Sequence, residues 1–116
     1  MKARTVSGLG VDLAEVARVR RLAADPRFLK RVFTAGELAY SLKSKNKYER
    51  LAARFAVKEA VIKALDDKSL PLNSIEVANS ASGSPRVTVK GRRGLTLLVS
   101  ISHTPAYAVA AVIAFK

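Results

Sequence analysis

The sequence predicts an α+β fold in which an antiparallel sheet packs on one long central helix. Residues 48–65 contain no Gly or Pro, and apolar side chains occur around nearly the whole circumference of the helix that they would form. Other elements should therefore cover this helix on most sides. From residue 73 onward the pattern changes to short alternating segments separated by turns, which is typical of antiparallel strands.

Length and composition limit the fold to a single domain over residues 1–116, because 116 residues suffice for one hydrophobic core. Hydrophobic residues make up 49% of the chain, which excludes disorder by composition. No run is long enough to cross a bilayer, and residues 1–10 lack the apolar segment of a signal peptide, so we expect no membrane partner. The absence of cysteine excludes disulfides and is compatible with the cytoplasmic location that we expect.

The charge balance is strongly basic, with 21 Lys and Arg against 9 Asp and Glu and a net charge of +12. Such a chain should bind a polyanion: nucleic acid, an anionic membrane surface, a phosphate-rich small molecule or an acidic protein. Composition alone would favour nucleic acid.

A first strand is expected over residues 5–13, with Gly8 and Gly10 inside it. Glycine within a strand usually marks a bulge or the close approach of another backbone. Asp12 lies at the end of this segment, and residues 14–24 then show helical spacing. Asp12 therefore either belongs to a site or is simply an acidic residue entering that helix, where the helix dipole favours it.

The next segments are shorter. Asp25 and Pro26 end the first helix, and residues 27–33 form a short apolar and basic segment. A capping-box pattern over residues 34–37 opens a short helix that extends to about Leu42. Residues 41–50 should be an exposed basic connection, which needs no function as a solvated loop but is also well composed for binding phosphate.

The central helix carries two charged pairs at i,i+4 spacing, Arg54 with Lys58 and Glu59 with Lys63. A Glu–Lys pair at this spacing is usually a solvated surface pair. This helix offers no clean polar face, however, and charges that are partly buried are costly unless partners bind them. We therefore expect these four side chains either to be paired or to take part in chemistry.

The second half of the chain reads as an antiparallel meander. His103 lies in the turn after the third of its four strands, where a lone histidine is usually structural, although its hydroxyl neighbours allow a phosphate-facing role. The expected strands cover residues 73–79, 86–90, 95–101 and 107–115.

Three segments carry a family resemblance. GLGVDLAEVARV near the N-terminus, ARFAVKEAVIKAL in the centre and SISHTPAYAVA near the C-terminus resemble, in this order, the three signatures of the holo-[acyl-carrier-protein] synthase family. These are the small 4'-phosphopantetheinyl transferases of bacterial fatty-acid synthesis. The resemblance covers most of residues 7–65 and 100–113.

The resemblance implies transfer of phosphopantetheine from coenzyme A to a serine of an acyl carrier protein, with release of 3',5'-ADP and a requirement for Mg²⁺. It places the magnesium ligands on Asp12 and Glu59. The helical lysine of the family corresponds to Lys63, which we expect to stabilise the departing phosphate. The catalytic pair would then be Glu59 and Lys63, with either Glu59 or a metal-bound water as the base.

The resemblance also implies the substrate contacts. Arg54, Lys58 and His103 would hold the phosphates of coenzyme A, and the turn at Gly83 and Pro85 corresponds to a coenzyme A-binding Gly-Lys-Pro turn whose lysine is Ser84 here. The usual Gly-Thr-Gly loop is also replaced, by residues 66–69. For the acidic carrier protein, the resemblance implies docking on Arg18, and we extend this surface to the neighbouring residues Arg20 and Arg21.

The family assembles as trimers with active sites between subunits, and a chain this short makes a poor cleft by itself. We therefore expect a homotrimer with the apolar C-terminal strands at its interface.

Two other functions remain open from the sequence. A basic nucleic-acid-binding domain would explain the charge, but we expect no nucleic-acid partner because the chain has no RNA-recognition aromatic pattern, GxxG clamp, helix-turn-helix or zinc signature. It would also leave Asp12 and Glu59 unexplained. A phosphopantetheinyl transferase that serves carrier domains of secondary metabolism would share the chemistry and differ in the partner.

Overall fold

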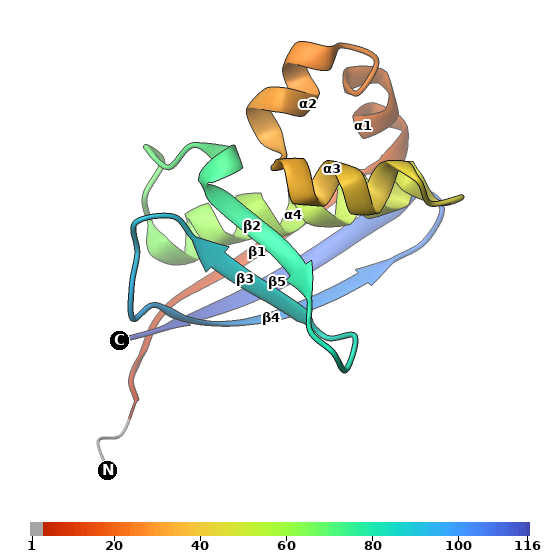
Figure 1. The fold of residues 1–116 in the computed structure, drawn as a ribbon. Helices are drawn as coiled ribbons and strands as arrows, with labels where there is room; N and C mark the ends of the chain where they lie inside the picture. Colours follow the sequence, from red (N-terminus) through yellow and green to blue (C-terminus); the bar gives the residue numbers. More distant parts are fainter. Residues whose placement is uncertain (1–3) are drawn as a thin grey trace.

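The computed structural model describes residues 4–116 and has the expected α+β fold, in which an antiparallel sheet packs on a long central helix (Figure 1). The elements in chain order are β1 (Val6–Glu15), α1 (Val16–Leu22), α2 (Pro26–Val32), α3 (Ala35–Leu42), α4 (Lys47–Leu65), the 3-10 helix η1 (Leu72–Ser74), β2 (Ile75–Asn79), β3 (Pro85–Val89), β4 (Thr96–His103) and β5 (Tyr107–Phe115). Within residues 4–116, no helix combines the length and the hydropathy needed to cross a membrane.

The strands form two antiparallel sheets, so the expectation of one continuous meander was wrong. β1, β5 and β4 form a three-stranded sheet in that order, whereas β2 and β3 form a separate hairpin. The central strand is β5, and its first neighbour is the N-terminal strand, with Gly10 opposite Val112. Pairing between the two ends of the chain leaves no local pattern in the sequence, because the partners are about a hundred residues apart.

β1 lies directly against α4 because it contains two glycines on the face that meets the helix. A Cβ atom on Gly8 would lie 1.7 Å from the carbonyl oxygen of Ala64, and one on Gly10 would lie 1.9 Å from that of Ala60. This confirms the interpretation of close backbone approach. A register irregularity also occurs between Val6 and Gly8. Asp12 follows on the same face of β1, so its side chain is also directed toward α4.

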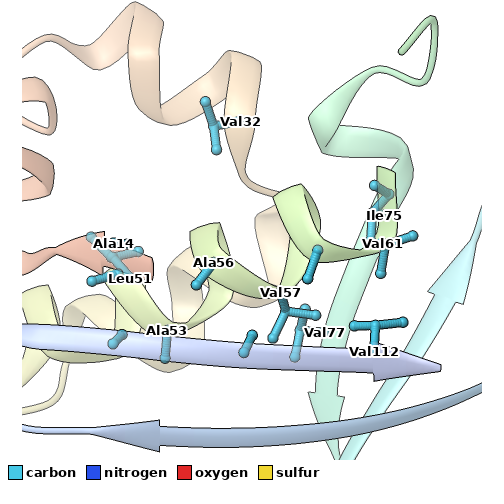
Figure 2. Packing of buried hydrophobic residues seen from close by; sticks show 14 of the residues in the cluster. Ala14, Val32, Leu51, Ala53, Ala56, Val57, Val61, Ile75, Val77 and Val112 are labelled. Atoms are coloured by element: carbon cyan, nitrogen blue, oxygen red, sulfur yellow. The ribbon is translucent and has the colours of Figure 1, made fainter. Parts of the chain in front are cut away.

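α4 is covered on most sides, as its sequence indicates. The strands pack against one side of it, and α1 and α3 pack against other sides. Figure 2 shows Ala53 and Val57 between the helix and the strands. Its buried residues are Leu51, Ala52, Ala53, Arg54, Ala56, Val57, Lys58, Ala60, Val61 and Ala64. Small side chains allow the backbones to approach closely.

Two short helices precede α4. The capping box is confirmed: the Glu37 backbone N–H donates to Thr34 Oγ1 at 3.2 Å, and the Thr34 N–H donates to Glu37 Oε1 at 2.9 Å. The apolar and basic segment before it forms a helix, α2, which the sequence analysis left unassigned. Asp25 caps α2 by accepting a hydrogen bond from the Arg27 N–H at 2.9 Å, and Pro26 occupies its first turn.

Asp12 lies inside β1, within the strand expected over residues 5–13, whereas His103 lies in a strand and not in the turn expected for it. Asp12 does not enter a helix, because β1 continues for three further residues to Glu15 before α1 begins. His103 is the last residue of β4, opposite Ala108 of β5, and does not lie in the turn. Pairing with β5 extends β1 and β4 beyond their apolar segments.

Candidate active site

Asp12 and Glu59 line a single pocket of about 310 Å³ where β1, α1 and α4 meet. β1 supplies Asp12 from the face directed at α4, and Glu59 is half-buried on the helix. Arg18 of α1 lines the same pocket, and Phe55 and Leu22 give it an apolar wall. The structure therefore brings together two carboxylates that lie far apart in the sequence.

Lys63 is held at the edge of this pair. Its Nζ donates to the carbonyl oxygen of Val11 at 2.9 Å and lies 3.3 Å from Asp12 Oδ1. The lysine side chain is 54% exposed whereas that of Asp12 is 20% exposed, so the ammonium group can still reach a ligand. Lys63 also lies one helical turn after Glu59 on the same face.

The electrostatics of the pocket favour a cation. Burial raises the pKa of Glu59, the negative charge of Asp12 raises it further, and the positive charges of Lys63 and Arg18 oppose both effects. The repulsion between two carboxylates in one pocket is relieved when a divalent ion binds between them.

The donor set fits Mg²⁺, which usually takes one or two carboxylates and completes its octahedron with water and substrate phosphates. Within residues 4–116 there is no cluster of three or more His, Cys, Asp or Glu side chains that could hold a metal ion. A site of two carboxylates therefore suits magnesium better than metals that require a full protein cage.

Lys58 does not reach a ligand, which corrects its assignment to coenzyme A. Its side chain is fully buried, and its Nζ lies 2.7 Å from Glu37 Oε1. The ammonium group also donates to the carbonyl oxygens of Leu72, at 3.0 Å, and Ile75. Burial lowers the pKa of Lys58, and the negative charge of Glu37 acts in the opposite direction. Its partners show that Lys58 joins α4 to α3 and to the start of β2.

Arg54 lies on a different side of the molecule from the carboxylate pocket. It lines a pocket of about 270 Å³ with Tyr40 of α3 and Glu76 and Asn79 of β2. Its guanidinium lies 4.6 Å from the centre of the Tyr40 ring, and its buried Nε has no hydrogen-bond partner within residues 4–116. Burial lowers the pKa of Arg54. A buried donor without a partner is costly, so this Nε is a polar group that residues 4–116 of the single chain leave unsatisfied.

The remaining residues assigned to coenzyme A also lie away from the two carboxylates. Gly83 has φ +90 in the turn between β2 and β3, and Pro85 begins β3 beside a shallow hollow of about 550 Å³. The His103 Nδ1 lies 3.1 Å from Glu49 Oε1. None of Gly83, Pro85, His103 and Arg54 lines the pocket of Asp12 and Glu59.

The three arginines of α1 are all exposed, and the extension of the docking surface from Arg18 to Arg20 and Arg21 stays a prediction. Arg18 lines the carboxylate pocket. The Arg20 guanidinium lies 5.0 Å from the centre of the Tyr48 ring, and Arg21 is 3.9 Å from Glu15. Successive residues of a helix point about 100° apart, so Arg21 lies on about the same side of α1 as Arg18, whereas Arg20 is directed to the opposite side.

Two acidic residues that no sequence pattern marked as part of a site hold charged side chains in place. Glu37 binds Lys58, and Glu49 binds His103. Only the capping box drew attention to Glu37, and no local pattern marked Glu49, whose partner lies 54 residues away.

The chain is similar to known proteins in both sequence and structure. Residues 8–112 match the 4'-phosphopantetheinyl transferase superfamily. A holo-[acyl-carrier-protein] synthase of Thermodesulfovibrio yellowstonii is 47% identical over 111 residues, which span 93% of this chain and 97% of the relative. The crystal structure of a holo-(acyl-carrier-protein) synthase from Bacillus anthracis in complex with CoA (3',5'-ADP) superposes with a TM-score of 0.85 at 30% identity, over 98% of this chain and 99% of that chain.

A second solved structure gives the same result. The Helicobacter pylori holo-[acyl-carrier-protein] synthase in complex with coenzyme A has a TM-score of 0.80 at 28% identity, over 91% of this chain and 98% of that chain. Sequence and structure agree along almost the whole length. The chain therefore belongs to the holo-[acyl-carrier-protein] synthases of the 4'-phosphopantetheinyl transferase superfamily.

Proposed function

We propose that this chain transfers the 4'-phosphopantetheine group from coenzyme A to a serine hydroxyl of apo-acyl carrier protein, releases 3',5'-ADP and requires Mg²⁺. The observation that carries the proposal is the pocket in which Asp12 and Glu59 meet beside the ammonium group of Lys63. The three relatives named above support the proposal because each is a holo-[acyl-carrier-protein] synthase. The two solved structures among them are complexes with coenzyme A or its 3',5'-ADP part.

Asp12 and Glu59 would hold Mg²⁺, which supplies charge neutralisation at the phosphoryl oxygens when it is bound. Lys63 stabilises the negative charge on the departing phosphate, and its hydrogen bond to the Val11 carbonyl fixes it there. Glu59 accepts the proton of the serine hydroxyl, directly or through a water.

The coenzyme A contacts are proposed for Arg54, Gly83, Pro85 and His103. These residues do not line the carboxylate pocket of their own chain. In a homotrimer with active sites between subunits, which we propose as the assembly, a second copy would supply them.

The sheet offers a surface for such an assembly on the face away from α4. Leu9, Ile113 and Leu98 lie directly opposite one another across β1, β5 and β4. A row of apolar side chains is exposed on this face, as expected of a monomer that buries them against copies of itself. The large exposed members are Leu9, Val11, Leu13, Leu98 and Val109.

The carrier protein would dock beside the pocket through Arg18. This arginine is exposed on α1 and lines the pocket next to Glu59. The net charge of +12 would speed the approach of an acidic partner. We place the reaction in the cytoplasm, which the absence of cysteine allows.

One assay tests the proposal. Incubation with coenzyme A, Mg²⁺ and apo-acyl carrier protein should add the mass of one phosphopantetheine to the carrier, measured by intact-protein mass spectrometry. Glu59→Gln should abolish the gain. A carrier of unchanged mass with the folded wild-type protein would contradict the proposal. A salt-sensitive gel shift with nucleic acid in the absence of transfer would favour the nucleic-acid-binding alternative, and transfer only to carrier domains of secondary metabolism would correct the partner.

A further inference from the structure

The single histidine of the chain is held by a carboxylate from another element. His103 ends β4, and its Nδ1 lies 3.1 Å from Oε1 of Glu49 in the first turn of α4. The Glu49 side chain is 18% exposed and the imidazole is 44% exposed. The carboxylate is thus sheltered while the ring that it holds remains open to solvent.

The pairing of Glu49 with a histidine is unusual in a chain this rich in Lys and Arg. Lys and Arg outnumber acidic residues by 21 to 9, and Glu49 lines a small pocket of about 150 Å³ that also contains Arg20 and Lys45. A glutamate in such surroundings would ordinarily pair with one of these cations. Here it pairs with the only imidazole, across 54 residues of sequence, so the fold itself aligns the two groups.

The pair fixes which nitrogen of His103 carries hydrogen. A carboxylate only accepts hydrogen bonds, so Nδ1 must be the donor to Glu49. Nε2 is then the nitrogen that remains for a ligand, and it donates to an anion when the ring is doubly protonated. The same carboxylate limits rotation of the ring, which reduces the conformational entropy lost when a ligand binds.

The surroundings fit a phosphate group. Arg20 and Lys45 lie in the pocket that Glu49 lines, and Pro105, two residues after His103, lines it as well. Glu49 therefore contacts the imidazole of His103 and also lines the pocket that contains these two cations. Convergent donors of positive charge are typical of phosphate sites.

We propose that Glu49 is a positioning residue that orients His103 and holds its Nδ1 as the donor, so that Nε2 is presented to a phosphate of coenzyme A. This inference rests on the proposed assignment of His103 to coenzyme A and deepens it. Glu49 itself makes no contact with the substrate and acts only through the imidazole.

The first test determines the tautomer of the His103 imidazole in the absence of substrate. Because the chain has one histidine, ¹⁵N-labelled protein gives a single set of imidazole signals. The neutral ring in the wild-type protein should be the Nδ1–H tautomer, and Glu49→Ala should shift it toward a mixture of tautomers. Glu49→Gln can either accept a hydrogen bond from Nδ1 or donate one to it, so it should hold the wild-type tautomer less firmly than Glu49 does. An unchanged tautomer in Glu49→Ala would overturn the inference.

The second test measures use of coenzyme A in the transfer assay. Glu49→Ala should raise KM for coenzyme A about 3- to 10-fold and leave kcat within about twofold, and Glu49→Gln should have a smaller effect on KM. In a His103→Ala background the Glu49→Ala change should add less than about twofold, because the group that it positions is absent. Asp25→Asn is the matched control: it makes the same change in charge and leaves a cap acceptor for α2, so KM should stay at the wild-type value.

The outcomes separate the two levels of the proposal. If His103→Ala leaves KM for coenzyme A unchanged, the assignment of His103 fails and the role of Glu49 fails with it. If His103→Ala raises KM for coenzyme A but Glu49→Ala leaves it unchanged, only the role of Glu49 fails. The same conclusion follows if Glu49→Ala raises KM as much in the His103→Ala background as in the wild-type protein. Thermal unfolding of each variant identifies any loss of activity that comes from loss of the fold.

Discussion

Two lysines on one helix, five residues apart, have opposite environments. Lys58 is fully buried against Glu37, whereas Lys63 is 54% exposed beside Asp12. Both residues carry an ammonium group, and the sequence of the helix shows no clean polar face that would distinguish them. The partner supplied by the rest of the fold therefore decides that Lys58 supports the structure and that Lys63 is available for chemistry.

Lys63→Ala should lower kcat by a factor of about 10² to 10³ and leave the affinity for coenzyme A almost unchanged, because the lysine acts on charge that develops during transfer. Steady-state kinetics together with calorimetric binding of 3',5'-ADP would measure both quantities. The opposite pattern, weak binding with normal turnover, would contradict the role.

Lys58→Met should lower the free energy of unfolding by about 3–5 kcal/mol, because it leaves the Glu37 carboxylate buried without its charge partner. Urea unfolding measures the loss. Adding Glu37→Leu should restore only part of it, since Glu37 also accepts hydrogen bonds from the backbone N–H groups of Thr34 and Val77. A Lys58→Met protein of wild-type stability with a raised KM for coenzyme A would instead return Lys58 to the binding site.

At the scale of elements, the contact between β1 and α4 builds the site. Gly8 and Gly10 allow the strand backbone to lie on the helix, and this contact carries Asp12 to within the pocket of Glu59. The contact involves helix backbone and not flexible side chains. It therefore cannot adjust to added volume without moving the strand.

Gly10→Ala should lower the free energy of unfolding by about 3 kcal/mol, at the upper end of the cost of overpacking, because its Cβ would lie 1.9 Å from the Ala60 carbonyl oxygen. Transferase activity of the folded fraction should fall as well, since displaced β1 carries Asp12 away from Glu59. Gly36→Ala is the control, because the nearest atom to its Cβ is the end of the Glu76 side chain at 3.1 Å, which can move. Equal stability of the two variants would contradict the close-contact argument.

At the scale of the whole molecule, two surface properties remain after the core is formed. The net charge is +12, and the sheet face away from α4 exposes large apolar side chains. The first suits an acidic partner and the second suits copies of the same chain. Each leads to a prediction that a measurement in solution can decide.

The apparent affinity for the acidic carrier protein should fall steeply as salt rises from about 0.05 to 0.5 M, because exposed charges are screened over a few ångströms at high ionic strength. Arg18→Ala should weaken binding and reduce the slope of this dependence, whereas Arg27→Ala, on the exposed surface of α2, should affect it less. A carrier affinity indifferent to salt would exclude docking by charge.

Leu9→Glu should convert the proposed homotrimer to smaller species while leaving the monomer fold intact, because Leu9 is 63% exposed in the single chain. Light scattering after size exclusion measures the mass, and far-ultraviolet circular dichroism checks the fold. Ala24→Glu makes the same change in charge at an exposed position between α1 and α2 and should leave the mass unchanged. A wild-type protein that is a stable and active monomer would contradict the assembly.

The sequence by itself determined those features that depend on local patterns. Periodicity located α4 to within one residue at its N-terminus and β5 over its full length, and the capping box located the start of α3. The glycines of β1 indicated close approach, and the charge of Glu59 and Lys63 on a mostly apolar helix indicated a site. These signals are local because they depend on residues at most a few positions apart.

Only the tertiary structure decided which charges belong to the site. Strand pairing between the two chain ends split the expected meander into two sheets, and packing buried Lys58 while it left Lys63 accessible. The partner of His103 also became known only from the fold. Each of these outcomes depends on contacts between residues tens of positions apart, and the free energy of such contacts comes from burial and pairing that no local pattern encodes.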